Sequence, residues 1–221
     1  MPISGYIITA VVAYLLGSIP TGYLVAKARG IDIRTIGSGN IGATNVFRYF
    51  GTVAGAFVLL ADALKGFLAV AVLTRLCWQV YGATGGPMAH DWLEIIAGLA
   101  VIIGHNFTCW LRFKGGKGIA TSAGVLVALV PYALLVIFVV WIIVFGLTRF
   151  VSLASICASF TLPFATWLTG GSSTLILITA AMSALAIYKH KSNIQRLLKG
   201  TESRIVLKKS PPLDSTPNSN S

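Results

Sequence analysis

Long apolar runs separated by short polar segments dominate this chain of 221 residues. A helix needs about 20 consecutive apolar residues to cross the ~30 Å hydrocarbon core of a bilayer. Runs of about that length occur five times, at residues 4–26, 53–76, 92–111, 152–168 and 173–189. Because runs of this length are typical of transmembrane helices, the pattern predicts an all-α, polytopic membrane protein.

One further apolar stretch, residues 119–148, is too long for a single comfortable crossing and contains Pro131. Lys and Arg favour cytoplasmic loops, so their distribution tests whether the chain crosses here once or twice. Two crossings, with the amino terminus outside, place 15 of the 17 basic residues on one side. We therefore predict about seven transmembrane helices in a bacterial inner (cytoplasmic) membrane, with the carboxyl terminus inside. Residues 119–130 are short for a span, so we expect a partial or re-entrant crossing there.

Composition agrees with a membrane protein and excludes several functions. Charged residues make up 10% of the chain, against roughly 25% in soluble domains. The net charge of +11 comes without a basic stripe interleaved with aromatics, so we expect no nucleic-acid partner. The three cysteines are far apart and odd in number, which disfavours a disulfide framework or a zinc site. Residues 1–209 are predicted to form one membrane domain, and the Pro- and Ser-rich residues 210–221 a disordered tail.

Three polar segments fall on the predicted cytoplasmic side, and the first covers residues 34–48. Its glycines permit positive φ angles, and successive N–H groups in such turns bind anions. The segment leads into the next span, whose helix amino terminus also favours an anion. A solvated loop with turn glycines is the alternative, but the density of donors favours phosphate binding. The candidates are Gly37, Ser38, Gly39, Asn40, Gly42, Ala43, Thr44, Asn45 and Arg48.

The second polar segment, residues 104–118, superficially resembles a P-loop. It lacks a glycine five positions before Lys117, and Gly118 stands where that motif needs Ser or Thr. A glycine-rich loop that carries two lysines and opens a helix is still a plausible phosphate cradle. The alternative is that the lysines only fix the topology. The candidates are His105, Lys114, Gly115, Gly116, Lys117 and Gly118.

In the third polar segment, residues 188–202, His190 and Asn193 share one face if the segment is helical. Arg196 and Glu202 follow them. The alternative is a basic anchor at the membrane surface. Asp62 and Lys65 lie three residues apart within the second predicted span, where charges are costly and usually paired or functional. An ion pair between them is the simplest prediction.

The acidic residues are too scattered to form a Mg²⁺ or Zn²⁺ site, so we expect no metal and no other cofactor. No Gly-x-Ser-x-Gly elbow is present. Ser38 is a candidate nucleophile, but residue spacing identifies no partner base.

The three segments resemble the motifs of the PlsY family. The matching stretches are Gly37–Asn45 with Arg48, then Gly104-His105 with Phe113–Gly118 and Ala120-Thr121, then His190 with Asn193-Ile194, Arg196-Leu197, Gly200 and Glu202. The resemblance extends over about residues 14–204. It implies acyl transfer from an acyl phosphate to the 1-hydroxyl of glycerol 3-phosphate, giving lysophosphatidic acid and inorganic phosphate. It also implies an apolar acyl groove opening to the bilayer, and functional coupling to an enzyme that produces acyl phosphate.

The resemblance also suggests residue roles. Ser38, Arg48, Lys117, His190 and Asn193 are the expected catalytic residues, and the other candidates in the three segments are expected to bind substrate. Direct attack by the hydroxyl is favoured over an acyl-enzyme on Ser38.

Two other functions are weaker candidates, a transporter of a small phosphorylated anion and a membrane scaffold. Against transport, the polar residues cluster on one face rather than at the midplane, and no inverted repeat is visible. A scaffold leaves the donors of the loops unexplained.

Overall fold

The structure is a computed structural model that describes residues 1–82 and 86–205. Within these ranges all regular structure is helical, which confirms the all-α prediction. The predicted tail lies outside the described residues. In chain order the elements are α1 (Ile3–Ser18), α2 (Thr21–Lys27), η1 (Ile33–Thr35), α3 (Ala43–Leu68), η2 (Ala69–Leu73), α4 (Thr74–Tyr81), α5 (Pro87–Asn106), η4 (Cys109–Leu111), α6 (Ile119–Leu129), α7 (Pro131–Thr148), α8 (Val151–Leu168), α9 (Ser173–Lys189) and α10 (Lys191–Leu198).

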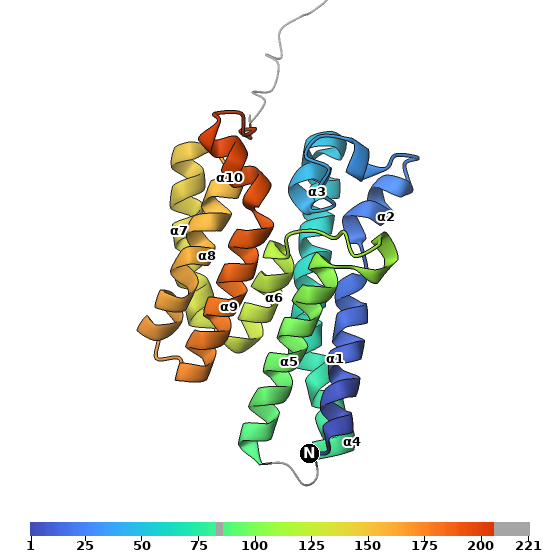
Figure 1. Ribbon diagram of the computed structural model, residues 1–221, viewed down its shortest axis with the longest axis vertical. Coiled ribbons are helices and arrows are strands. Elements are labelled where there is room, and N and C mark those ends of the chain that lie inside the picture. The colour runs from blue at the N-terminus through green and yellow to red at the C-terminus, as the bar shows by residue number, and fades with distance from the viewer. Residues whose placement is uncertain (83–85, 206–221) are drawn as a thin grey trace, which may run out of the picture.

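The helices form two groups that are joined through α6 (Figure 1). In the first group α1 packs on α5, and in the second α8 packs on both α7 and α9. α6 lies between the groups and packs on α3. The amino terminus and α4 are at one end of the molecule, while α2, α10 and the start of α3 are at the other (Figure 1). This second end therefore gathers the polar segments.

Five helical segments in the described ranges are long and apolar enough to cross a membrane, or six if the bent pair α9–α10 counts as one span. The seventh apolar segment is α6, with only 11 residues. At 1.5 Å per residue it is about 16 Å long, roughly half the hydrocarbon thickness. The break before Pro131 and the short helix preceding it agree with the sequence-based expectation of a partial crossing, so the predicted count of seven is approximate.

Three predicted spans differ from the observed helices. One was predicted at residues 92–111, where α5 covers Pro87–Asn106. The span predicted at residues 4–26 breaks between α1 and α2 at Pro20, which lacks a backbone N–H. The span predicted at 53–76 is part of a longer helical segment that runs from Ala43 to Tyr81. Gly51, with φ 82° and ψ −177°, interrupts it, and the short π-helix η2 lies within it. Hydropathy missed the two ends of this segment because they carry polar residues, which a helix can include where it extends beyond the bilayer.

Glycines let the helices approach closely. A Cβ atom added to Gly17 on α1 would lie 2.0 Å from the carbonyl oxygen of Val101 on α5. The same addition to Gly124 on α6 would lie 1.8 Å from the carbonyl oxygen of Ala63 on α3. Small residues at such crossings allow the backbone contact that drives helix association in membranes.

We expect Gly124→Ala to destabilise the protein by about 1–3 kcal/mol, because the added methyl group must push α6 away from α3. Gly146→Ala on α7 is the matched control. A Cβ atom there meets nothing within 4 Å, and alanine favours a helix over glycine by about 1 kcal/mol. Thermal unfolding in detergent should therefore show a lower Tm for the first variant only. Equal Tm values would contradict the tight α3–α6 contact.

Candidate functional site

The loop before α3 is shaped by Asn45, which is buried. Its side-chain amide donates to the backbone oxygens of Ile33, Ile36 and Asn40 at 3.0–3.3 Å, and its Oδ1 accepts from the Ser38 N–H at 3.2 Å. These contacts occupy both ends of the side chain. Asn45, predicted as a substrate ligand, therefore holds the loop in shape.

The same loop presents backbone and hydroxyl groups at its surface. Gly37 and Gly39 have φ angles of 57° and 67°, in the left-handed region that favours glycine. Asn40 Oδ1 accepts from the Gly42 N–H at 2.8 Å, just before α3 begins at Ala43. Ser38 is exposed, and the one hydrogen bond of its Oγ within residues 1–82 and 86–205 is a long one, accepted from the Asn40 N–H at 3.4 Å.

The second loop, between η4 and α6, folds over His105. The N–H groups of Gly115 and Gly116 donate to the carbonyl oxygens of Asn106 and His105 at 3.2 and 3.0 Å. A Cβ atom on Gly116 would lie 2.2 Å from His105 Nε2, so only glycine fits there. Gly118, with φ 79°, then starts α6. The contact of Gly116 with His105 and the positive φ angle of Gly118 therefore explain these two glycines without any ligand.

His105 belongs to a buried polar network that joins three helices. Lys65 Nζ lies 2.9 Å from His105 Nδ1 and 2.8 Å from Asp62 Oδ1, and it also donates to the Ile19 carbonyl oxygen at 3.0 Å. Thr21 donates to Asp62 at 3.0 Å. The predicted Asp62–Lys65 pair is thus present, and the network positions the second loop through His105.

The third segment is bent by 57° at His190, between α9 and α10. The Nδ1 atom of His190 lies 2.8 Å from the carbonyl oxygen of Ala186. A carbonyl oxygen only accepts, so Nδ1 carries the proton and Nε2 is left as an acceptor. Asn193, one turn later, is buried. His190 thus lies at the bend, just before α10, and Asn193 lies in the first turn of that helix.

Side chains from all three segments meet around Glu202. Lys117 Nζ donates to Asn193 Oδ1, while Asn193 Nδ2 and Arg196 Nε donate to the Glu202 carboxylate at 2.6 and 2.7 Å. Arg48 Nη2 donates to the Ser203 carbonyl oxygen at 2.8 Å. Lysine, arginine and asparagine from three distant parts of the sequence thus form one group. We call these five residues, Arg48, Lys117, Asn193, Arg196 and Glu202, the basic cluster.

The basic cluster holds three cations against one carboxylate. Burial lowers the pKa of the Lys117 ammonium to about 8, Glu202 opposes this shift, and Arg196 and Arg48 add to it. Burial alone raises the pKa of the Glu202 carboxyl, but hydrogen bonds from Ser152, Arg196 and Asn193 lower it overall. The carboxylate therefore stays ionised, and the excess positive charge suits an anionic ligand.

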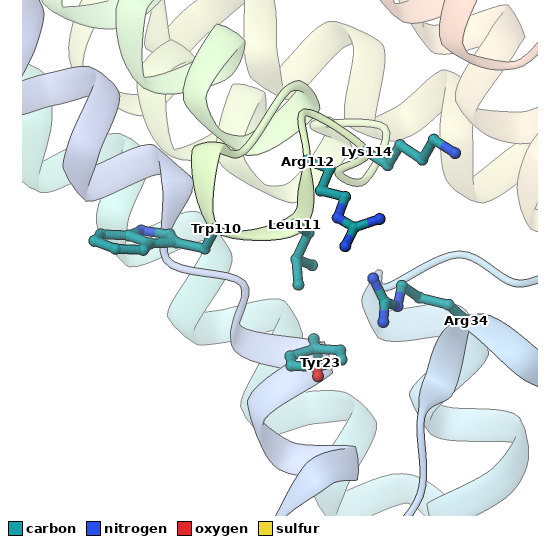
Figure 2. Close-up of a pocket in the computed structure, with 6 residues that line it drawn as sticks. All are labelled: Tyr23, Arg34, Trp110, Leu111, Arg112 and Lys114. Atoms are coloured by element: carbon teal, nitrogen blue, oxygen red, sulfur yellow. The ribbon is translucent and has the colours of Figure 1, made fainter.

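Two predicted site residues, Thr44 and Lys114, lie outside the basic cluster, and one residue that contacts it was not predicted. Thr44 makes no side-chain hydrogen bond in the part of the chain that the structure describes, and exposed Lys114 lines a separate pocket (Figure 2). Ser152, which donates to Glu202 at 2.7 Å, was missed because a serine in an apolar helix carries no sequence signal. No three His, Cys, Asp or Glu side chains in residues 1–82 and 86–205 are grouped to hold a metal ion.

Known proteins resemble this chain over almost its whole length. A sequence family described as glycerol-3-phosphate acyltransferase matches residues 7–200. A glycerol-3-phosphate acyltransferase of Desulforudis audaxviator is 48% identical over 198 residues, which are 89% of this chain and 94% of that protein. One of Endomicrobium trichonymphae is 43% identical over 200 residues, 90% of this chain and 95% of the relative.

A solved structure also resembles this chain. The crystal structure of PlsY, an integral membrane glycerol 3-phosphate acyltransferase, in its glycerol 3-phosphate form matches with a TM-score of 0.80 and 38% identity, covering 91% of this chain and 96% of PlsY. These matches confirm the resemblance stated from the three motifs and the prediction of a multi-pass integral membrane protein. The chain belongs to the glycerol-3-phosphate acyltransferase family that includes PlsY.

Proposed function

We propose that this enzyme transfers an acyl group from an acyl phosphate to the 1-hydroxyl of glycerol 3-phosphate. The products are lysophosphatidic acid and inorganic phosphate. The observation that carries the proposal is the basic cluster, in which cations from three distant segments gather with a single carboxylate. Both substrates bear phosphate, and a site with excess positive charge favours such groups. Structures of PlsY in glycerol 3-phosphate and lysophosphatidic acid forms support the acceptor and the product.

In the proposed reaction the residues position the substrates and stabilise charge. Arg48 and Lys117 bind phosphate oxygens, and Asn193 holds Lys117 in place. The acceptor hydroxyl oxygen attacks the acyl carbonyl carbon, an ester C–O bond forms, and the bond from that carbon to the phosphate oxygen breaks. The hydroxyl proton passes to the departing phosphate or to His190 Nε2. The Ser38 hydroxyl stabilises the oxyanion, since the N–H groups of Ser38, Gly39 and Asn40 already donate within the loop.

The remaining candidates take supporting roles in this proposal. The glycines of the two loops fix the turns that place the other donors, since the N–H groups of Gly42, Gly115 and Gly116 already donate within the protein. Thr44 adds a hydroxyl donor, and Glu202 with Arg196 braces the third segment. The Lys65 network positions the second loop through His105.

An apolar groove of about 510 Å³ between α3 and α6 suits the acyl chain. Its walls include Phe57, Leu60, Leu64, Phe67 and Val127, and Gly124 keeps the two helices close. The side chains of Leu60 and Leu64 are more than half exposed in the protein, as expected for a surface that faces lipid. We propose that the acyl chain enters here from the bilayer.

We also propose that the motif-bearing end of the molecule faces the cytoplasm of a bacterial inner membrane, since its loops carry most of the Lys and Arg residues. The donor would then come from a cytoplasmic enzyme that makes acyl phosphate.

The identity of the donor is tested by comparing palmitoyl phosphate with palmitoyl-CoA. Purified full-length protein in nanodiscs is given each donor with glycerol 3-phosphate, and lysophosphatidic acid is measured by mass spectrometry. We expect product from palmitoyl phosphate only. Product from palmitoyl-CoA alone would overturn the proposed donor while leaving the family assignment intact.

The lowered pKa of Lys117 predicts a pH dependence. An ammonium group is charged below its pKa, so above about pH 8 the free enzyme loses the Lys117 cation. The kcat/KM for glycerol 3-phosphate should then fall, approaching tenfold per pH unit, because the substrate phosphate stays doubly charged above about pH 6. In Lys117→Arg this fall should be absent, since guanidinium stays protonated. A flat wild-type profile from pH 7 to 9.5 would contradict the role of Lys117.

A further inference from the structure

A second group of cationic side chains lines a cavity apart from the basic cluster. The cavity has a volume of about 470 Å³, lies between α2–η1 and the loop that follows α5, and is lined by Tyr23, Arg34, Trp110, Leu111, Arg112 and Lys114 (Figure 2). None of the five residues of the basic cluster lines it. The cavity is therefore a separate feature of the same end of the molecule.

The charges in this cavity are poorly balanced. The guanidinium groups of Arg34 and Arg112 point toward one another across it (Figure 2). Arg34 is paired with Asp32 at 2.6 Å and lies over the Tyr23 ring. Within residues 1–82 and 86–205, no carboxylate comes within 4.0 Å of Arg112 or Lys114. Two guanidinium groups that face each other repel, and an anion held between them removes that repulsion.

Arg112 has a backbone conformation that is unfavourable for a residue other than glycine. Its φ and ψ angles are 54° and 44°, in the left-handed region that non-glycine residues seldom adopt, and Phe113 follows with φ 60°. Burial of the side chain does not explain this backbone conformation, because Arg112 is exposed. The position is consistent with binding an anion through its planar, forked donors.

Two aromatic residues of the cavity lie near the ends of candidate membrane spans. Trp110 closes the candidate span Pro87–Leu111, and Tyr23 is near the end of the span Ile3–Lys27. Trp and Tyr are enriched at the membrane–water interface. Trp110 is 66% exposed and points outward, away from Arg34 and Arg112 (Figure 2). An exposed indole near the end of a candidate span favours lipid beside the cavity.

We propose that this cavity binds the phosphate of an anionic phospholipid headgroup. Glycerol 3-phosphate offers the same phosphate chemistry, but the outward-facing Trp110 favours a lipid, whose chains would lie along the indole. The bound lipid ties the loop that carries Lys117 to α2 and to the membrane surface.

Quenching of tryptophan fluorescence tests this proposal without using activity. The full-length protein is placed in vesicles of phosphatidylcholine that contain a rising fraction of brominated phosphatidylglycerol or brominated phosphatidylcholine. The signal of Trp110 is the difference between the wild-type protein and the Trp110→Phe variant, which retains the other tryptophans. We expect brominated phosphatidylglycerol to quench Trp110 at lower fractions than brominated phosphatidylcholine does. Arg112→Gly should weaken this preference about fivefold, the effect of one cation at an anionic surface.

Arg112→Gly suits the experiment because glycine favours the observed backbone conformation, so the variant is not expected to misfold. Arg149→Gly is the matched control: it also replaces an exposed left-handed arginine, with φ 62°, but between α7 and α8. It should leave the preference unchanged. Equal quenching by both lipids, or an unaltered preference in Arg112→Gly, would overturn the proposal. Loss of the preference when millimolar glycerol 3-phosphate is added would assign the cavity to the free substrate and overturn the lipid.

Discussion

Lys117→Ala is expected to lower kcat/KM for glycerol 3-phosphate by about 10³-fold, the cost of removing a preorganised charge that stabilises the transition state. Lys117 connects the second segment to the third through Asn193, and its ammonium is the cation that the loop Lys114–Gly118 brings to the basic cluster. The variant loses the proposed phosphate contact and the hydrogen bond to Asn193, which Glu202 still holds.

The control for this variant is Lys199→Ala. Lys199 is exposed at the end of α10 and makes no side-chain hydrogen bond or ion pair in the described part of the chain. Both variants should retain the wild-type Tm, because Glu202 keeps its bonds from Ser152, Asn193 and Arg196. Wild-type activity in Lys117→Ala would remove this residue from the site.

Ser38→Ala is the second large effect, a loss of about 10²-fold in kcat with little change in Tm. Ser38 is exposed on the loop before α3, and among the described residues its hydroxyl makes only one long hydrogen bond, so we expect the fold not to depend on it. Ser192→Ala is the control, since Ser192 is an exposed serine on α10 at the same end of the molecule. Full activity in Ser38→Ala would contradict the proposed oxyanion contact.

The same serine decides between direct attack and an acyl-enzyme. A nucleophilic serine needs a base within hydrogen-bond reach, and in the described residues Ser38 Oγ contacts only the Asn40 N–H. Intact mass spectrometry of wild-type protein incubated with palmitoyl phosphate alone should therefore show no palmitoyl adduct. An adduct in the wild type that is absent from Ser38→Ala would favour the covalent route.

Sequence reasoning located most helices because apolar length and proline position are local signals. Residues 173–189 were predicted with the observed bounds of α9, and Pro131 was predicted to separate two segments. The span predicted at residues 53–76 was too short. Hydropathy detects the apolar part of a helix, whereas this helical segment runs from Ala43 to Tyr81. The bend at His190 depends on how α10 packs, which no local pattern records.

The candidate site was foreseen as a set of residues but not as a set of contacts. Asn45 looked like a ligand because its amide is polar and lies in a glycine-rich loop, yet the fold uses its donor and acceptor to shape that loop. The joining of His105 to the Asp62–Lys65 pair crosses 40 positions of sequence, so spacing could not reveal it. The facing of Arg34 and Arg112 likewise depends on two loops meeting in space.

The most direct measurement is phosphate release from palmitoyl phosphate by the purified protein, with and without glycerol 3-phosphate. The account predicts release that depends on glycerol 3-phosphate and equals the lysophosphatidic acid formed. Release that is independent of glycerol 3-phosphate, or none from a protein shown to be folded, would contradict it.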